Sequence, residues 1–141
     1  MSDLFSIIYA SASVKFFSKE DLIELLKTFK SKNMAKGITG MLLYKDGNFI
    51  QAIEGHEEDV IELYQKIVND PRHTNVIQLG RQPIFERQFP DWSMGFRNID
   101  DLTRAELEGY SRFLDRNFTP EYFKEDPIRA YTMLQAFKQN M

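Results

Sequence analysis

Two polar residues stand at positions where a β-strand should bury them. Gln51 lies between Phe49 and Ile53 by the period-two alternation of a strand, and Tyr9 shares one face of an earlier apolar run with Ile7. A buried amide without a partner costs on the order of 1 to 3 kcal/mol, and a buried phenol also seeks an acceptor. Tyr9 and Gln51 therefore either satisfy each other inside an ordinary core or share hydrogen bonds with a bound ligand.

Three further groups of residues could contact a ligand, and each has an ordinary structural explanation. Asn33 follows the first predicted helix and could cap its C-terminus, because asparagine tolerates the left-handed conformation. Trp92 and Met94 share one face of the last predicted strand, which is common core composition. Residues 70–73, Asp-Pro-Arg-His, follow the second predicted helix and would ordinarily form a solvated loop. No single one of these groups indicates a binding site.

Hydrophobic periodicity predicts the elements that position these residues. Asp46-Gly47 is a turn signal between two apolar runs and predicts a hairpin, and Pro71 should end the helix before it. The predicted strands cover residues 4–11, 37–44, 49–54, 76–85 and 92–97, and the predicted helices cover residues 18–32 and 57–69. The order βαββαββ predicts an α+β ferredoxin-like sandwich with both helices on one face of a mostly antiparallel sheet.

The other face of the predicted sheet also needs a cover. Four apolar strand residues should point toward it, namely Ile8, Leu43, Ile50 and Ala52. Residues 101–114 and 127–138 have the apolar spacing of two further helices. We expect these helices to pack on that far face or on a partner subunit.

The composition excludes several classes of function. The chain has 141 residues, with 18 Lys and Arg, 21 Asp and Glu, a formal net charge of −3 and no cysteine. A negative chain is a poor partner for nucleic acid, and a chain without cysteine can form no disulfide, thiolate metal site or cysteinyl adduct with a cofactor. No apolar run approaches the roughly 18 residues of a membrane span, and the N-terminus lacks a secretory signal, so we expect a cytoplasmic protein without membrane contact.

Five short segments, taken together and in order, resemble the BLUF domains, blue-light sensors that use FAD. The segments are Ile8-Tyr9-Ala10-Ser11, Asn33-Met34-Ala35-Lys36-Gly37-Ile38-Thr39-Gly40, Phe49-Ile50-Gln51-Ala52-Ile53-Glu54-Gly55, Asp70-Pro71-Arg72-His73 and Trp92-Ser93-Met94. Any one of them is weak, but five in this order are a specific signal. The resemblance implies a flavin-binding domain over residues 1–98 and a C-terminal helical extension over residues 99–141.

The resemblance also implies a cofactor site. A flavin, FAD or alternatively FMN, would lie without a covalent bond between the two predicted helices, with Leu25 and Ile67 of their apolar stripes as walls. Asn33 would hydrogen-bond the polar edge of the ring. The remaining residues of the implied cofactor site are Arg72, His73 and Lys32 at the ribityl and phosphate end, together with Asp70 and Ser11.

The light response implied by the resemblance centres on Tyr9. Tyr9 would donate an electron and a proton to the excited flavin, and Gln51 would change orientation or tautomer and exchange its hydrogen bonds with the ring. An amide suits this because its donor and acceptor ends have nearly the same shape. Trp92 and Met94 would pass the change from a slightly red-shifted signalling state to the C-terminal helices or to a partner protein.

No catalytic output domain is evident in the sequence, so we expect a sensor that is not an enzyme, forms a homo-oligomer and acts through a separate signalling protein.

Three alternative functions are compatible with the same predicted fold. The first is a regulatory module that binds a metabolite in the same pocket. The second is an acylphosphatase-like hydrolase, which would need an arginine early in the chain to hold an anion, and residues 1–71 contain no arginine. An RNA-binding sheet could stack bases on Tyr9 and Phe49, but the negative charge opposes it. Fold alone cannot choose among these functions.

Overall fold

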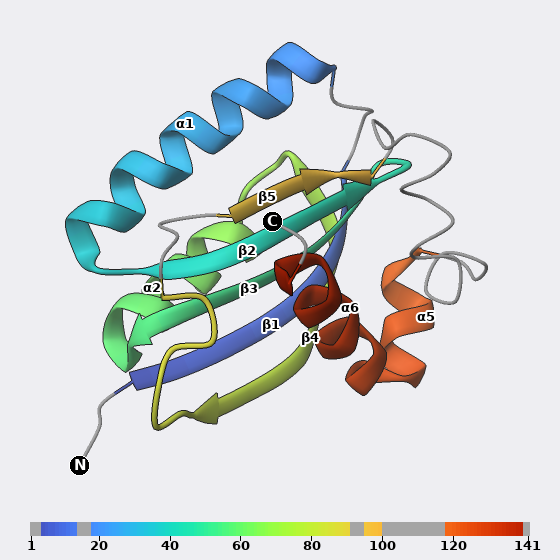
Figure 1. Ribbon diagram of the computed structural model, residues 1–141. Helices are drawn as coiled ribbons and strands as arrows, with labels where there is room; N and C mark the ends of the chain where they lie inside the picture. Colours follow the sequence, from blue (N-terminus) through green and yellow to red (C-terminus); the bar gives the residue numbers. More distant parts are fainter. Residues whose placement is uncertain (1–3, 14–17, 91–94, 100–117, 140–141) are drawn as a thin grey trace.

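The chain is arranged around a five-stranded sheet in the computed structural model, which describes residues 4–13, 18–90, 95–99 and 118–139 (Figure 1). The elements in chain order are β1 (Leu4–Ser13), α1 (Lys19–Lys36), β2 (Thr39–Lys45), β3 (Asn48–His56), α2 (Glu57–Val68), β4 (His73–Pro83), β5 (Gly95–Asn98), α5 (Pro120–Glu125) and α6 (Pro127–Gln139). The strand order is β4-β1-β3-β2-β5. All neighbouring strands pair antiparallel except β2 and β5, which are parallel. The predicted ferredoxin-like α+β fold is confirmed.

α1 begins where the sequence predicted and ends later. Ser18 and Asp21 form a capping box in which the Asp21 N–H donates to Ser18 Oγ at 3.1 Å and the Ser18 N–H donates to Asp21 Oδ2 at 3.2 Å. The helix ends at Lys36, beyond the predicted Lys32, and Gly37 caps it with a left-handed φ of 68°. Asn33 is therefore not the C-terminal cap considered from the sequence, because it lies inside α1 and glycine takes the left-handed position at less steric cost.

The β2–β3 hairpin sets the register of the central strands. Asp46 and Gly47 both have positive φ, 51° and 78°, as a tight two-residue turn between right-twisted strands requires. The predicted hairpin is confirmed. On its other edge β3 pairs with β1, and this register places Tyr9 directly opposite Gln51.

The two helices α1 and α2 share one core with the sheet. Leu25 and Phe29 of α1 and Val60 of α2 pack in the same cluster as Ile7 and Ile53 of the strands. Alternation along the strands therefore works as predicted, because odd-numbered residues of β1 and β3 face these helices.

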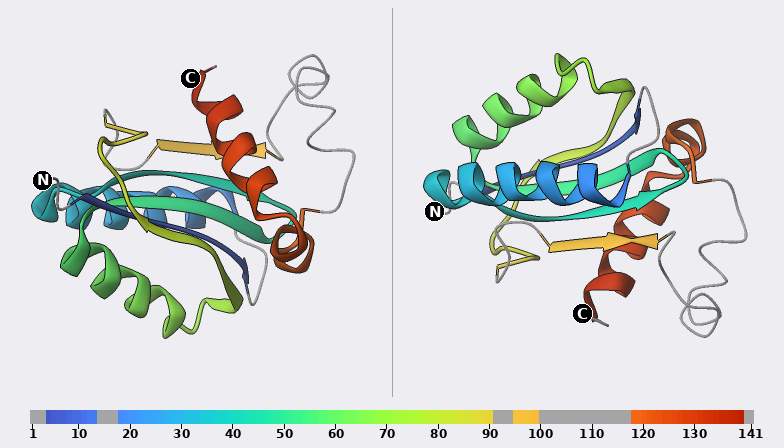
Figure 2. Two further views of the ribbon diagram at one scale, coloured as in Figure 1. Left: turned by 90° about the horizontal axis from the view of Figure 1, so that it is seen from below. Right: turned by 90° about the horizontal axis from the view of Figure 1, so that it is seen from above.

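The opposite face of the sheet is covered by α6, which lies across the sheet from α2 (Figure 2). Met133, Leu134 and Phe137 of α6 are fully buried against the apolar residues predicted to need a cover, namely Ile8, Leu43, Ile50 and Ala52. The predicted helix over residues 127–138 is thus confirmed on the far face. The predicted helix over residues 101–114 lies outside the described residues.

Several element boundaries differ from the sequence predictions. β4 covers residues 73–83 rather than 76–85, because Asp70 closes a turn in which the His73 N–H donates to the Asp70 carbonyl at 3.1 Å. β5 is described over residues 95–98, whereas the prediction was residues 92–97. α5 was not predicted, although Thr119-Pro120 is an N-terminal helix signal, with Thr119 Oγ1 accepting from the Tyr122 N–H. None of the described helices is long and apolar enough to cross a membrane.

Candidate functional site

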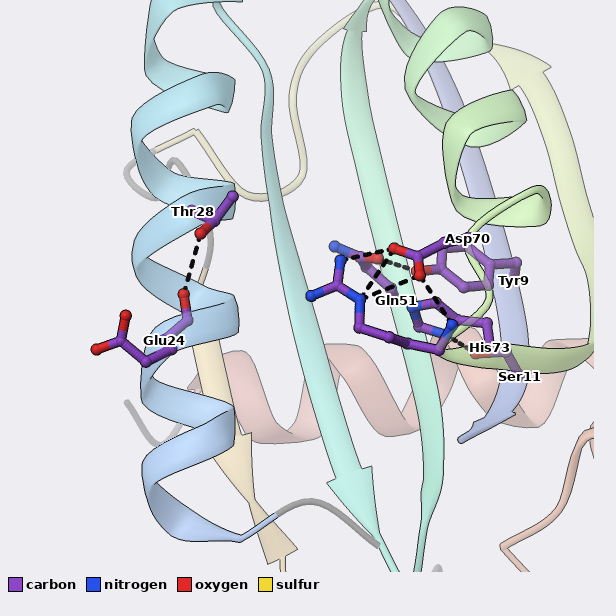
Figure 3. A network of polar contacts seen from close by, with 8 residues as sticks. Tyr9, Ser11, Glu24, Thr28, Gln51, Asp70 and His73 are labelled. Carbon is purple, nitrogen blue, oxygen red and sulfur yellow. Dashed lines mark hydrogen bonds and ion pairs between the residues drawn. The ribbon is translucent and has the colours of Figure 1, made fainter. Parts of the chain in front are cut away.

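Tyr9 and Gln51 face each other across β1 and β3. Both side chains have no exposed surface, and the Tyr9 hydroxyl donates a hydrogen bond to Gln51 Oε1. Figure 3 shows the pair together with Ser11, Asp70 and His73, at the place where β1, β3 and the chain after α2 meet. The sheet register thus supplies the partner that each buried polar residue was predicted to need.

A second phenol lies beside this pair. The ring of Tyr64, from α2, has its centroid 5.7 Å from that of Tyr9, and the two planes are tilted by 58°. Burial raises the pKa of Tyr9 far above its ordinary value, and the negative charges of ionised Tyr64 and of Asp70 raise it further. Tyr9 therefore keeps its proton near neutral pH, and its hydroxyl remains a hydrogen-bond donor.

A cavity of about 380 Å³ lies between α1 and α2. Pockets for small molecules typically occupy roughly 300–1,000 Å³ and combine apolar walls with a few polar groups. The apolar walls here come from both helices and from the residue just before β2, namely Phe29, Ile38, Leu63 and Ile67. A flat, largely apolar ring fits walls of this kind.

The polar lining of the cavity differs between its buried and its exposed parts. The Asn33 amide, which has 1% of its surface exposed, is the buried polar group of α1 in the lining. Four cationic side chains also line the cavity, namely Lys32 and Lys36 of α1, Lys66 of α2 and Arg72 after it, together with the carboxylate of Asp70. An amide can both donate to and accept from a heterocycle, and cations suit an anionic tail.

Asp70 and Arg72 form a forked ion pair at the edge of the cavity. Arg72 Nε lies 3.0 Å from Asp70 Oδ1, and Arg72 Nη2 lies 2.6 Å from Asp70 Oδ2. The hydrogen bond from Arg72 is the main reason that the pKa of Asp70 is lowered, and it raises the pKa of Arg72 in turn. The pair fixes the guanidinium beside the cavity and partly compensates its charge.

A second set of charges joins the two helices beside the cavity. Glu62 Oε1 lies 3.0 Å from Lys36 Nζ of α1 and 3.2 Å from Lys66 Nζ of α2. The hydrogen bonds from both lysines lower the pKa of Glu62. Because all three side chains are exposed, this bridge orients the lysines more than it stabilises the fold.

Five of the residues predicted to bind a cofactor line the cavity, and three do not. Lys32, Asn33, Ile67, Asp70 and Arg72 are lining residues. Leu25 packs in the core one helical turn before Phe29. Ser11 and His73 are buried and hydrogen-bonded to each other, with Ser11 Oγ 3.0 Å from His73 Nδ1.

The sequence analysis missed several lining residues that helical spacing could have indicated. Phe29 lies four residues before Asn33, and Leu63 lies four residues before Ile67, so each shares a helix face with a residue that was predicted. Lys36 and Lys66 were missed because surface lysines carry no distinctive pattern. Trp92 and Met94 lie outside the described residues, so their predicted roles stay predictions.

Residues 4–95 match the family described as sensors of blue-light using FAD. A curated relative, the photoactivated adenylate cyclase subunit beta of Euglena longa, is 38% identical over 94 residues. The match covers 66% of this chain and 11% of that protein, so the chain spans about a tenth of its relative's length.

Two solved structures resemble the fold described above. The dark-state structure of BlrB, a BLUF protein, is 28% identical with a TM-score of 0.80, and the match covers 100% of this chain and 99% of that one. Klebsiella pneumoniae BlrP1, solved with FMN and cyclic diGMP, is 31% identical with a TM-score of 0.67, and the match covers 88% of this chain and 35% of that one. The family match includes most of the described sheet, both helices of the cavity and the Tyr9–Gln51 pair. The chain therefore belongs to the BLUF family, the flavin-binding sensors of blue light.

Proposed function

We propose that this protein holds the flavin in the cavity between α1 and α2 and responds to blue light through Tyr9 and Gln51. The observation that carries the proposal is a fully buried tyrosine–glutamine hydrogen bond close to a cavity with apolar walls and a buried amide. Asp70 links the two, because it lines the cavity and its charge acts on Tyr9.

The lining residues suit the parts of a flavin nucleotide. Phe29, Leu63 and Ile67 would hold the ring, and Asn33 would hydrogen-bond its polar edge. Arg72 and Lys32 would meet the ribityl and phosphate end. Leu25 would support the wall from behind, while Ser11 and His73 would fix the strand ends beside Tyr9 and Asp70. We propose FAD, the flavin in the family's description, with FMN as the alternative because FMN is named with the BlrP1 structure.

When bound, the flavin supplies the absorption of blue light and an excited ring that accepts an electron. Tyr9 would donate that electron, together with its hydroxyl proton, to the ring. Because the hydroxyl donates to Gln51 Oε1, loss of the proton removes a hydrogen bond that fixes the orientation of the amide. Gln51 can then rotate or change tautomer within the same volume, so donor and acceptor exchange places without repacking the core.

The proposed output leaves through the far side of the sheet. Residues 1–98 would form the sensor, Trp92 and Met94 would detect the change at Gln51, and residues 99–141 would carry it to a separate signalling protein. We also propose that the chain is a cytoplasmic homo-oligomer and not itself an enzyme. The position of α6 opposite the cavity supports such an output, and so does a relative that is named as a photoactivated cyclase.

An absorption spectrum of the purified protein, supplied with FAD and FMN during expression, tests the proposal. We expect a yellow protein whose flavin is released by acid or heat and is identified as FAD by chromatography. Blue light should shift the flavin bands slightly to the red, and the shift should reverse in the dark. A colourless protein would favour the metabolite-binding module, and a flavoprotein with no reversible shift would contradict the light response.

A further inference from the structure

Glu54 is a buried carboxylate on the strand that carries Gln51. Only 1% of its surface is exposed, and strand alternation places it on the opposite face from Gln51. Glu54 Oε1 accepts from the Phe89 N–H at 2.6 Å and from Thr39 Oγ1 at 3.2 Å, and Glu54 Oε2 accepts from the Gln88 N–H at 3.0 Å. The carboxylate thus binds the chain between β4 and β5 to the middle of the sheet.

Arg87 strengthens this attachment without pairing with the carboxylate directly. Its Nη1 donates to Thr39 Oγ1 at 2.9 Å and to the Glu54 carbonyl oxygen at 3.2 Å. Charge-assisted hydrogen bonds such as those accepted by Glu54 are about twice as strong as neutral ones. Residues 87–89 should therefore follow any displacement of β3 at Glu54.

Two of these three residues, Gln88 and Phe89, are held on their other side by α6. The Phe89 ring is buried in the core beneath α6, and Lys138 Nζ lies 5.4 Å from the centre of that ring. Lys138 Nζ also donates to the Gln88 carbonyl oxygen, and the Tyr131 hydroxyl donates to Gln88 Oε1 at 3.4 Å. A chain of direct contacts therefore runs from β3 through residues 87–89 to α6.

We propose that Glu54 is a positioning residue that couples the strand carrying Gln51 to α6 through residues 87–89. Glu54 follows Gln51 by three positions on one strand, so a change in strand position or twist at Gln51 moves the carboxylate. The two amides bound to it then shift Phe89 and Gln88 beneath Lys138 and Tyr131. This route is separate from the one proposed through Trp92 and Met94, and it rests on the proposed light response at Gln51.

A label on α6 tests the route in light. The chain has no cysteine, so Ile128→Cys, at a side chain 76% exposed, introduces a single site for an environment-sensitive fluorophore. Glu54→Gln should retain the flavin and its red shift, while the light-minus-dark change of the label falls by about threefold or more. Glu58→Gln makes the same chemical change at an exposed position of α2 and should leave the label response unchanged. An undiminished label response in Glu54→Gln, whatever its stability, would overturn the proposal.

Lys138→Met tests the far end of the route and serves if Glu54→Gln does not fold. It removes the cation and keeps most of the side-chain volume, and it should reduce the label response with an unchanged red shift. Hydrogen exchange in the dark tests the coupling without light. Glu54→Gln should speed exchange of the α6 amides, and Lys138→Met should speed exchange at Phe89. Unaltered exchange of these amides in both variants would reject the coupling. If illumination of the unmodified protein produced no red shift, only the proposed light response would be rejected.

Discussion

At the scale of single residues, the phenol of Tyr9 and the amide of Gln51 both need a hydrogen-bond partner, and no solvent reaches them to provide one. Neither side chain has exposed surface, and burial raises the pKa of Tyr9, so the phenol keeps both its proton and its acceptor in the dark. An amide in this position has two ends that differ in hydrogen bonding and hardly in shape. The pair is therefore stable as it stands and can be rearranged when the proton leaves.

Tyr9→Phe should separate a structural from a photochemical role. The change removes the hydroxyl and keeps the ring, so flavin should stay bound while the free energy of unfolding falls by about 1 to 3 kcal/mol, because the hydrogen bond from Tyr9 to Gln51 Oε1 is lost. No red-shifted state should form, since phenylalanine has no phenolic proton and is a far poorer electron donor. Spectra before and after illumination, with flavin content and urea unfolding, measure these effects.

Two further variants serve as controls for Tyr9→Phe. The ring centroid of Tyr64 lies 5.7 Å from that of Tyr9. Tyr64→Phe removes the hydroxyl of this neighbouring residue and should keep the red shift. Gln51→Leu fills the same volume without a donor or acceptor and should abolish the shift. A normal, reversible red shift in Tyr9→Phe would show that Tyr9 is only structural.

His73 should give the protein an acid-sensitive stability. Burial is the main cause that lowers the pKa of His73, and Nε2 has no hydrogen-bond partner among the described residues. The unfolded chain takes up its proton near pH 6.5, before the folded one does. The stabilisation that comes from keeping His73 neutral in the folded protein is therefore complete above about pH 6.5, and it is lost as the pH falls toward the lower pKa of His73 in the folded protein.

The two histidines of the chain allow a matched test of that pH dependence. His73→Gln should flatten the fall of the unfolding free energy measured by urea titration between about pH 7.5 and pH 5. His56→Gln makes the same chemical change at an exposed side chain and is the matched control. Equal slopes in all three proteins would mean that His73 titrates alike in the folded and unfolded chain.

At the scale of elements, the end of α1 decides where Asn33 lies. The helix continues to Lys36 because Gly37 adopts a φ of 68° and donates its N–H to the carbonyl oxygens of the last turn. Asn33 consequently stays on the helix face that lines the cavity, one turn after Phe29. The C-terminal cap of α1 is thus part of what positions the proposed flavin site.

Gly37→Ala should lower the free energy of unfolding by roughly 1 to 2 kcal/mol, because a side chain is unfavourable in the left-handed conformation. Apart from Gly37 itself and its two chain neighbours, no residue has an atom within 4 Å of the added Cβ, so the cost comes from the backbone conformation. Gly80→Ala is the matched control, since that position also has open space and its φ is not left-handed. Urea unfolding compares the two variants, and equal stability would show that the cap contributes nothing.

The sequence predicted the elements better than it predicted their contacts. The hairpin followed from the Asp46-Gly47 turn signal between two apolar runs, and the faces of β1 and β3 followed from the period of two of a β-strand. The full length of α1 was missed because its last turn, residues 33–36, continues no apolar stripe. β4 was misplaced because it is a partly exposed edge strand with little alternation in burial. The register that joins Tyr9 to Gln51 depends on the pairing of β1 with β3 across 42 positions, which short-range patterns do not encode.

At the scale of the whole molecule, one sheet separates two hydrophobic cores among the described residues, and only one of them adjoins the cavity. The core beneath α1 and α2 adjoins the cavity and contains residues around the Tyr9–Gln51 pair. The core beneath α6 contains Phe89, Phe123 and the fully buried residues of α6. A defect in the second core should therefore change stability without reshaping the cavity.

Phe137→Ala should test this separation. Removing a fully buried aromatic ring from the α6 core should lower the free energy of unfolding by about 3 to 5 kcal/mol, while folded protein keeps its flavin content and dark spectrum. Ile128→Ala, at an exposed position of the same helix, should change stability by no more than about 0.5 kcal/mol. Urea unfolding and the dark spectrum measure both effects, and loss of flavin from folded Phe137→Ala would show that the two cores are not separate.

Every residue of β3 from Phe49 to Gly55 is buried, and its side chains alternate between the two cores. Under the proposed function, substitutions in α1 and α2 would adjust the light response over evolutionary time, and substitutions in α6 would adapt the proposed output to new partners, each with little effect on the other core. β3 has no such freedom, because each of its side chains from Phe49 to Gly55 is buried on one face of the sheet or the other and its backbone pairs with β1 and β2. Diversification within this lineage should therefore proceed around an almost invariant central strand, with Gln51 and Glu54 on its two faces.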